Sequence, residues 1–408
     1  MKLRDRVVLQ DVTVLGAGYS GLTTAAELAL RGYRVRVVAQ SLGSAPPMTI
    51  VGTQSRRFPG MSASTENFTQ DDLLARELAT IDRFLPLAAD PARTGVRVIP
   101  GVKVSRRSGV WWNVRELPAE LKARATQTQR NMQLVCSPPR VKDATVATLH
   151  AAGYASVDQA PVLMIESEVY FRHLISIIKA AGGMICLGCK VHDAAGMAHA
   201  AGGDDSQVGE GDHAPPALAV INCMGVAAHG AGGASGTYSN IRGEVLVFDQ
   251  CPVPLPFYVV DDDKQSSIAQ LPSGQLYMCG EPRPRRVPGG WDVACTRATL
   301  AGASDLCAAL LPRGAVPTLC DVSESWALDR PTRLEGFNVG LRGGELSSGG
   351  TGASTSPLIL DNSGHSGAGV AASWSCAASV ADLLEGRIGS QSESAAARQH
   401  HSQSQSRL

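Results

Sequence analysis

The chain has 408 residues, 44% of them apolar, and its 37 Lys and Arg residues balance 37 Asp and Glu residues. This length is enough for a large core and two domains. The balanced charge argues against a nucleic-acid partner. No stretch of about 18 apolar residues is free of charge, so we predict no membrane-spanning helix and no membrane partner. The charged N-terminus also lacks the apolar region of a signal peptide.

A strand–helix–strand unit opens the chain. Residues 7–15 and 33–39 are rich in β-branched residues and are predicted to be strands, with a helix over residues 20–31 between them. Helices are also predicted over residues 71–88, 169–183 and 291–312, and strands before Met224, at 244–249 and at 275–279. Three segments rich in Gly, Ser and Ala are predicted to be loops, namely 194–216, 343–355 and the residues after about 389.

The first strand runs directly into the hexapeptide GAGYSG, which contains Gly16, Ala17, Gly18 and Gly21. In this spacing the first glycine permits a tight turn, the second lets backbone approach a pyrophosphate, and the third allows close packing of helix on strand. The pyrophosphate then lies at a helix N-terminus, where free N–H groups favour negative charge. The unit therefore predicts a dinucleotide site. Gln40 and Ser41 stand where an acidic residue usually binds the ribose, so a neutral hydrogen bond is expected there.

A second glycine-rich turn leads into a helix near the end of the chain, in the sequence GHSGAGVAASWSCAASVADLLEGR from Gly364. A helix is expected here through Trp374 and Leu384, with Gly386 just past its end. A second helix N-terminus suits a flavin, because reduction places negative charge on one edge of the ring. An ordinary packing helix is the alternative for this segment taken alone.

The motifs together resemble those of the D-amino-acid oxidases, FAD enzymes that include D-aspartate oxidases and are commonly peroxisomal. The resemblance rests on VLGAGYSGLTTAAELALRGYRVRVVA, VINCMGVAA, IRGEVLVF, DRPTR and GHSGAGVAASWSCAASVADLLEG, which occur in the order seen in that group. It implies an α/β fold in which a Rossmann-like FAD-binding domain is interleaved with a mixed-sheet substrate domain. It also implies oxidative deamination of a neutral or acidic D-amino acid by O2, giving an imino acid that hydrolyses to a keto acid and ammonia, with hydrogen peroxide as the second product.

The resemblance also assigns roles to individual residues. Arg330 would bind the substrate carboxylate in a two-point fork, which suits a planar guanidinium. Val191 would lie near the adenine and Gly225 near the flavin, while His365 would be structural. Gly364 would let the backbone approach the isoalloxazine. The turn and first helical residues would face that ring, and they are His365, Ser366, Gly367, Ala368, Gly369, Val370 and Ala371.

The chain departs from that group at several positions. Ala269 stands where an active-site tyrosine is expected, and Gln265 falls near the position of a second one. Met224 and Ala371 replace a small polar residue and a hydroxyl residue. Losing a phenol hydrogen bond costs on the order of 1–3 kcal/mol. An oxidase of glycine, sarcosine or another small amine, and a flavin-binding protein without catalysis, therefore stay as alternatives.

A basic cluster follows the predicted strand at 275–279. Arg283, Arg285 and Arg286 are candidates to bind a second substrate carboxylate, with a solvated basic loop as the alternative. Ten cysteines are scattered through the chain, and Cys186 and Cys189 lack a second pair at zinc spacing. We therefore expect no metal site and mostly buried thiols in a reducing compartment.

Domain boundaries follow from the resemblance. The FAD-binding domain is expected to comprise residues 1–66, 157–229 and 330–389, the substrate domain 67–156 and 230–329, and residues 390–408 a disordered tail. The last three residues, Ser406, Arg407 and Leu408, are a variant of the Ser-Lys-Leu address read by a peroxisomal import receptor. A peroxisome-type organelle is thus expected, with the cytoplasm as the alternative, and the sequence is compatible with a homodimer.

Overall fold

A computed structural model describes residues 11–43, 46, 48–50, 69–107, 117–136, 140–191, 217–225, 238–281, 283–284, 293–333, 335–342 and 357–388. Several sequence predictions fall outside these residues: the candidates Arg285 and Arg286, the three loop segments almost entirely, and Ser406 to Leu408. Within the described residues no helix is long and apolar enough to cross a membrane.

One sheet is largely parallel and carries the predicted strand–helix–strand unit. Among the described residues it has six strands in the order β14-β15-β7-β1-β2-β6. All neighbours pair in parallel except β14 and β15. The strands are β1 (Asp11–Ala17), β2 (Arg34–Leu42), β6 (Met184–Leu187), β7 (Ala219–Asn222), β14 (Asn338–Leu341) and β15 (Leu358–Ser363).

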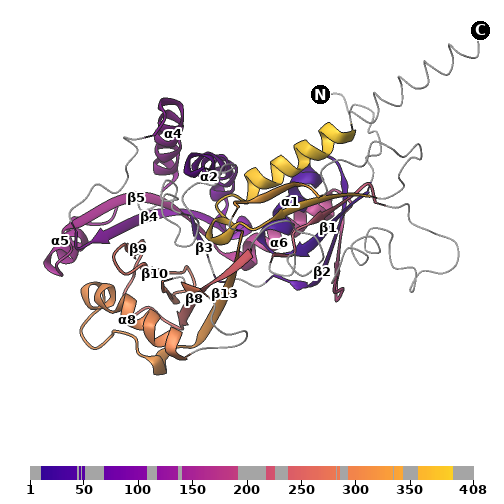
Figure 1. Ribbon diagram of the computed structural model, residues 1–408. Helices are drawn as coiled ribbons and strands as arrows, with labels where there is room; N and C mark the ends of the chain where they lie inside the picture. Colours follow the sequence, from indigo (N-terminus) through magenta and orange to yellow (C-terminus); the bar gives the residue numbers. More distant parts are fainter. Residues whose placement is uncertain are drawn as a thin grey trace, which may run out of the picture.

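Helices of low polarity pack against this sheet. α1 (Tyr19–Leu30) has every residue from Gly21 to Ala29 buried, as expected for a helix that connects two parallel strands. α6 (Ser167–Ala180) packs beside it. The last helix of the described chain spans residues 373–388, drawn in yellow in Figure 1, and we call it the C-terminal helix. Arg31 at the end of α1 donates to Asp382 and Glu385 of the C-terminal helix, which fixes the two helices together.

The second sheet is mixed and mostly antiparallel. Within the described chain it has nine strands, eight in the order β12-β8-β11-β10-β9-β4-β5-β3, with β13 paired to β8. Among its described strands, β4 and β9 pair in parallel and the other pairs are antiparallel. The strands are β3 (Met48–Ile50), β4 (Val96–Ser105), β5 (Ser156–Ile165), β8 (Tyr238–Phe248), β9 (Tyr258–Asp261), β10 (Ser266–Gln270), β11 (Leu276–Cys279), β12 (Arg283–Pro284) and β13 (Glu324–Arg333).

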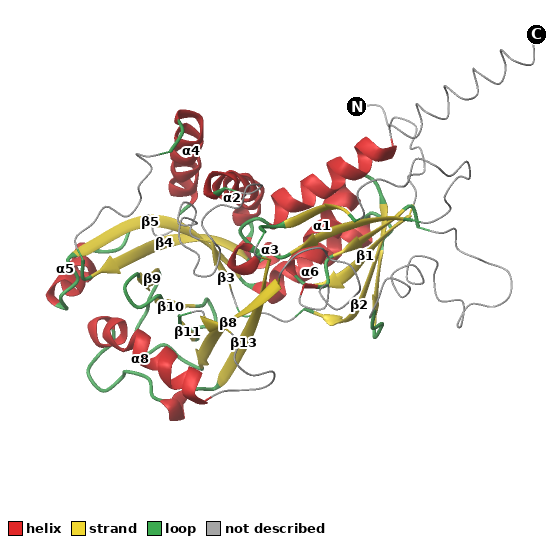
Figure 2. Ribbon diagram, viewed as in Figure 1, coloured by secondary structure: helices red, strands yellow, loops and turns green. Residues whose placement is uncertain are grey.

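The two sheets form two lobes (Figure 1). In the second lobe, β4 and β5 run from the junction with the first lobe to the far end, where α5 (Asp143–Ala151) lies. Two groups of helices and short turns lie beside the second sheet (Figure 2). One group lies near the junction of the two lobes, where α3 contacts α6, and comprises α2 (Gln70–Phe84), η2 (Leu85–Ala89), α3 (Pro91–Thr94) and α4 (Ala119–Val135). The other group covers the second lobe and comprises α5, α8 (Val293–Leu310) and η6 (Leu319–Asp321).

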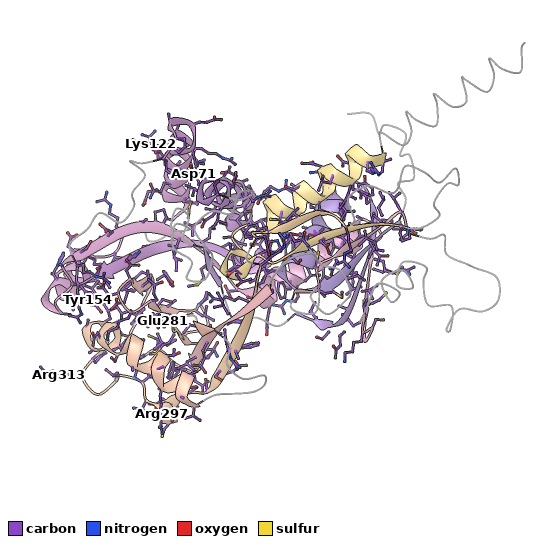
Figure 3. The ribbon with its side chains drawn as sticks, viewed as in Figure 1. Asp71, Lys122, Tyr154, Glu281, Arg297 and Arg313 are labelled. Carbon is purple, nitrogen blue, oxygen red and sulfur yellow. The ribbon has the colours of Figure 1, made fainter. Side chains whose placement is uncertain are left out.

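Each lobe has its own hydrophobic core. The larger core combines α1, α6, the six-stranded sheet and the C-terminal helix, and it also takes in Ile81 and Phe84 from α2. The smaller core lies between the second sheet, α5 and α8. Tyr154, which Figure 3 shows near α5, belongs to this core and donates to the buried Asp261 at 3.0 Å. Two cores support the α/β fold class expected from the sequence.

Strand pairing gives a sharper view of the lobes than the sequence could. β3 and nearly all of β5 come from segments assigned to the FAD-binding domain, yet β3 pairs with β5, and β5 pairs with β4 in the second sheet. β13 also belongs to the second sheet, although its last residues were expected in the FAD-binding domain. The precise domain boundaries therefore stay a prediction.

Candidate functional site

The turn between β1 and α1 contains glycines that pack closely against neighbouring backbone. Gly16 has a φ of +103°, and a Cβ atom there would lie 2.5 Å from the Cys223 carbonyl oxygen. A Cβ on Gly21 would lie 1.9 Å from the Gly16 carbonyl oxygen. At Gly18, by contrast, nothing lies within 4 Å of the added atom. The turn is therefore closed on the protein side and open at Gly18.

The N-terminus of α1 has no internal partner for its first N–H groups. Its N-cap is Gly18, which provides no side-chain hydrogen bond, and the first turn has no acidic residue. Free N–H groups and the helix dipole make this end suitable for an anion. Ala17 lies beneath the turn, and its carbonyl oxygen accepts from the Gly43 N–H at 2.9 Å.

The second glycine-rich segment follows β15 and lies beside this turn. Gly364 has a φ of +79° and Ser366 a φ of +51°. A short 3-10 helix, η7 (Ser366–Ala368), comes next, and the regular helix begins only at residue 373. The left-handed backbone at two positions explains why the helix starts later than its sequence suggested. The prediction for its end is wrong as well, since Gly386 lies inside the helix and not past it.

A cavity of about 250 Å³ lies between the two glycine-rich turns and β13. Nine of its lining residues were predicted from the sequence: Gly18, Gly225, Arg330, Gly364, His365, Ser366, Gly367, Gly369 and Val370. Six more line it as well: Tyr19, Ser20, Cys223, Pro331, Asn362 and Ser363. The structure therefore brings together residues more than 300 positions apart in the chain.

Arg330 is the one cationic side chain among the residues lining this cavity. Its side chain forms no hydrogen bond or ion pair with any residue that the structure describes. Burial lowers the pKa of the guanidinium, and the nearby Cys279 thiol and Tyr258 phenol oppose that shift. A buried cation without a carboxylate is costly unless a ligand supplies one, so Arg330 is a site for an anionic group.

His365 lies deep in the same cavity and is only 6% exposed. Its Nδ1 lies 3.4 Å from Ser20 Oγ, and its Nε2 has no hydrogen-bond partner within the described chain. Burial, aided by the positive charge of Arg76, lowers the pKa of His365 to about 4. The imidazole is therefore neutral at physiological pH and offers one hydrogen bond to the cavity.

The remaining predicted residues lie outside the cavity lining. Gln40 and Ser41 are exposed at the end of β2, where the Gln40 carbonyl accepts from the Gly188 N–H at 3.1 Å. Val191 packs near Leu15 and Val38, on the β1–β2 part of the sheet. Ala368 and Ala371 are buried behind the turn.

Gln265, a candidate for binding the substrate side chain, is not among the described residues that line the cavity. Gln265 sits in the turn between β9 and β10 with a φ of +49°, and its amide donates to the Asp262 carbonyl at 2.7 Å. Arg283 lies in β12, where its backbone pairs with Arg242 of β8. Within the described residues no cluster of His, Cys, Asp and Glu could hold a metal ion.

Sequence reasoning missed the link between β13 and the second glycine-rich turn. Thr332 Oγ1 lies 2.9 Å from Ser366 Oγ, and Thr332 also forms an isolated β-bridge with His365. The Arg333 N–H approaches the Gly364 carbonyl at 3.4 Å. Only Arg330 was singled out in the DRPTR motif, although the threonine two residues later was visible beside it.

Asn362 is a second residue that no sequence signal identified. It is 1% exposed, and its amide donates to Thr24 Oγ1 at 2.9 Å, while its Oδ1 has no partner in the described part of the chain. Asn362 Oδ1 and His365 Nε2 are thus two buried polar atoms at one cavity whose hydrogen bonds are unmade. Buried polar atoms normally have partners, so both atoms indicate a bound group.

A glycine-rich βα turn, a parallel sheet and a second turn facing it define a dinucleotide-binding oxidoreductase fold. The family model described as FAD dependent oxidoreductase matches residues 11–383, so the chain belongs to this family. A D-amino-acid oxidase from Rubrobacter xylanophilus is 30% identical over 389 residues, covering 93% of this chain and 97% of that protein.

Solved structures support the fold at lower identity. A glycine oxidase from Bacillus cereus has a TM-score of 0.58 and 16% identity, covering 93% of this chain and 95% of that one. An L-proline dehydrogenase from P. horikoshii has a TM-score of 0.59 and 12% identity, covering 92% and 93%. The expected family and fold class are therefore confirmed.

The residues present fit the FAD that the family requires. The open space at Gly18 and the uncapped start of α1 suit its pyrophosphate. Asn362 Oδ1 and His365 Nε2 are available to complete their hydrogen bonds with it.

Proposed function

We propose that this protein catalyses the oxidative deamination of a D-amino acid, with Arg330 as the residue that binds the substrate carboxylate. The observation that carries the proposal is the position of Arg330, which faces the cofactor cavity and has no anionic partner among the described residues. The D-amino-acid oxidase that is 30% identical supports the substrate class.

FAD, when bound, supplies the acceptor for the two electrons that leave the Cα–H bond of the substrate and passes them to O2. The chain supplies binding and orientation. Arg330 provides two N–H donors in one plane, which fix the carboxylate and therefore the direction of the Cα–H bond. The balanced reaction converts a D-amino acid, water and O2 into a keto acid, ammonia and hydrogen peroxide.

The described residues around the cavity favour catalysis by positioning over catalysis by a side-chain base. His365 is neutral because burial lowers its pKa to about 4, and its Nδ1 lies near Ser20. Burial also raises the pKa of the nearby Cys279 thiol, which keeps it protonated. The backbone of the turn from Gly364 to Gly369 lines the cavity and can supply N–H groups without any change of charge.

Two tyrosines of neighbouring strands lie beside position 269, where the expected tyrosine is absent. Ala269 is 6% exposed and packs in a small cluster with Met164 and Leu271, against which Tyr258 and Tyr277 lie. Tyr258 is close enough to Arg330 to influence its pKa. We infer that phenol groups of neighbouring strands stand in for the missing tyrosine.

Anaerobic mixing of the FAD-loaded enzyme with amino acids tests the proposal. We expect D-alanine to bleach the flavin absorbance and L-alanine to leave it unchanged, while D-aspartate, glycine and sarcosine in parallel report the side-chain preference. Bleaching by glycine or sarcosine alone would favour an oxidase of another small amine. Bound flavin that no substrate bleaches would contradict the proposal and favour a flavin-binding protein without catalysis.

Replacing the arginine tests its assigned role. Arg330→Lys keeps the charge but loses the two-point fork, so we expect kcat/KM to fall roughly 10- to 100-fold, mainly through KM. Arg313→Lys is the matched control, because Arg313 is exposed just beyond the end of α8, at the outer edge of the second lobe (Figure 3). Wild-type kinetics in Arg330→Lys would exclude Arg330 as the carboxylate ligand.

A further inference from the structure

A glycine interrupts the middle of β8 at a position where strands rarely use one. Gly243 is buried and has neighbouring strands on both sides, with β13 on one edge and β11 and β12 on the other. Glycine weakens a strand interior, and it is retained where another group approaches the backbone closely. The group that approaches Gly243 identifies what this position does.

The approaching group is the guanidinium of Arg330. A Cβ atom added to Gly243 would lie 2.7 Å from Nη2, 3.1 Å from Cζ and 3.2 Å from Nε of Arg330. Three guanidinium atoms are thus at nearly equal distances from one point, so the planar group lies against the bare Cα of Gly243. No other residue supplies one of the three nearest atoms, so the contact belongs to this pair.

Strand register explains how the contact arises. In the antiparallel pair of β8 and β13, Arg330 is opposite Ile241 and Leu328 is opposite Gly243. Arg330 and Gly243 are therefore diagonal neighbours, and a long side chain on one strand reaches across the other. The side chain of Arg330 extends along β8 from the level of Ile241 to that of Gly243, where the missing side chain leaves room for it.

We propose that Gly243 is a positioning residue for the reaction, because the Arg330 guanidinium packs against its bare Cα and is thereby directed towards the substrate carboxylate. The inference rests on the proposed function of Arg330. Any side chain at position 243 occupies the space of the guanidinium, and the atoms that must move belong to the flexible end of Arg330. The strand and the cofactor site keep their places while the carboxylate ligand is displaced.

Gly243→Ala in the FAD-loaded enzyme tests this inference by carboxylate binding. Propionate is the probe, since it is D-alanine without its amine and cannot be oxidised; its binding is followed by the visible spectrum of the bound flavin. We expect propionate affinity and 1/KM for D-alanine to fall about tenfold or more, with a smaller change in kcat. Gly340→Ala is the control, since Gly340 is also in a strand and a Cβ there meets nothing within 4 Å.

A double-mutant cycle separates positioning from a general structural effect. If Gly243 acts through Arg330, then Gly243→Ala has no further effect on propionate binding in an Arg330→Ala background. An equal effect in both backgrounds would overturn the inference, as would wild-type propionate affinity in Gly243→Ala. Wild-type protein that binds no propionate would instead refute the role of Arg330 itself.

Folding of the variants is informative too. If Gly243→Ala fails to fold but Gly243→Ala/Arg330→Ala folds, the close contact between the two residues is supported. If neither folds, Gly243 serves the strand and not the arginine, and the inference fails. Flavin content and thermal melting of each variant decide between these outcomes.

Discussion

His365 shows how a single buried side chain makes this fold depend on pH. Its ring packs edge-on against Phe337, with the ring centres 4.9 Å apart, and the side chain is almost fully enclosed. Water therefore cannot stabilise the imidazolium, and the positive charge of Arg76 opposes it further. The native protein must keep this histidine neutral under conditions in which an unfolded chain protonates it.

We expect His365 to lower the stability of the protein as the solution becomes acidic. Its pKa is about 4 in the fold against 6.5 in a free chain, so between these values the unfolded state binds the extra proton. The free energy of unfolding then falls as pH drops from 6.5 to 4, by on the order of 3 kcal/mol in total. Urea unfolding at several pH values, compared between wild type and His365→Gln, measures this contribution.

The comparison isolates one group. Burial also raises the pKa of Glu77, to about 8, and that carboxyl titrates in both proteins, so its contribution cancels in the difference. A wild-type curve parallel to that of His365→Gln between pH 6.5 and 4 would contradict the assignment. A neutral His365 is something the sequence could not predict, because its burial depends on Phe337 and on α2.

In the turn between β1 and α1, two glycines of one motif serve different purposes: Gly21 allows close packing, and Gly18 leaves open space for a ligand. We expect Gly21→Ala to break the packing of α1 on β1, since its methyl group would lie 1.9 Å from the Gly16 carbonyl oxygen. Gly18→Ala meets nothing within 4 Å of its methyl group, so the fold should survive while the methyl group intrudes where the pyrophosphate binds.

Thermal melting without FAD and FAD titration separate the two effects. Gly21→Ala should melt well below wild type, and Gly18→Ala should melt near it but bind FAD roughly tenfold or more weakly. Normal FAD affinity in Gly18→Ala would contradict the placement of the pyrophosphate.

The link between β13 and the second turn connects the strand of Arg330, the proposed carboxylate ligand, with the turn proposed to bind the cofactor. Thr332 Oγ1 lies 2.9 Å from Ser366 Oγ, next to a residue whose φ is +51°. We expect Thr332→Val to weaken both FAD binding and carboxylate binding by several-fold, because an isosteric side chain removes the hydrogen bond alone. Thr332→Ser should restore both, and loss of only one affinity would show that the two sites are not coupled.

The sequence predicted which helices and strands form better than it predicted where they begin and end. β-branched runs and helical periodicity located β1, α1, β2, α6 and α8, because those patterns are local. The C-terminal helix was placed too early, since Ser366 has a left-handed backbone and its side chain bonds to Thr332 of a distant strand. Non-glycine residues in that region are rare, so no sequence pattern announces them.

On the scale of the whole molecule, the glycine motifs and DRPTR identified the residues of the site, but the pairings that assemble it were not predictable. β5 pairs with β4 over ten positions from Val96 to Ser105, and β13 pairs with β8 over ten positions. Such long-range register depends on which faces become buried together, which is a property of the folded chain. The contact between Gly243 and the Arg330 guanidinium exists only because of that register.

Glu27 joins three segments that lie far apart in the sequence. It belongs to α1, and its carboxylate pairs with Arg31 of the same helix and with Arg83 of α2. Arg83 in turn lies over the Trp374 ring of the C-terminal helix, 4.7 Å from its centre. The side chain of Glu27 is only 9% exposed, whereas Glu385, the outer partner of Arg31, is 46% exposed.

The difference in burial predicts different costs for the same substitution. Glu27→Gln leaves two arginines without their shared carboxylate in a half-buried position, so we expect a loss of about 2 kcal/mol in the free energy of unfolding. Glu385→Gln removes an exposed charge from the same arginine and should cost about 0.5 kcal/mol or less. Because Glu27 helps to hold α1, whose first residues Tyr19 and Ser20 line the cavity, its loss should also weaken FAD binding, measured by titration alongside urea unfolding. Equal costs for the two substitutions, or unchanged FAD affinity in Glu27→Gln, would mean that packing alone holds these helices together.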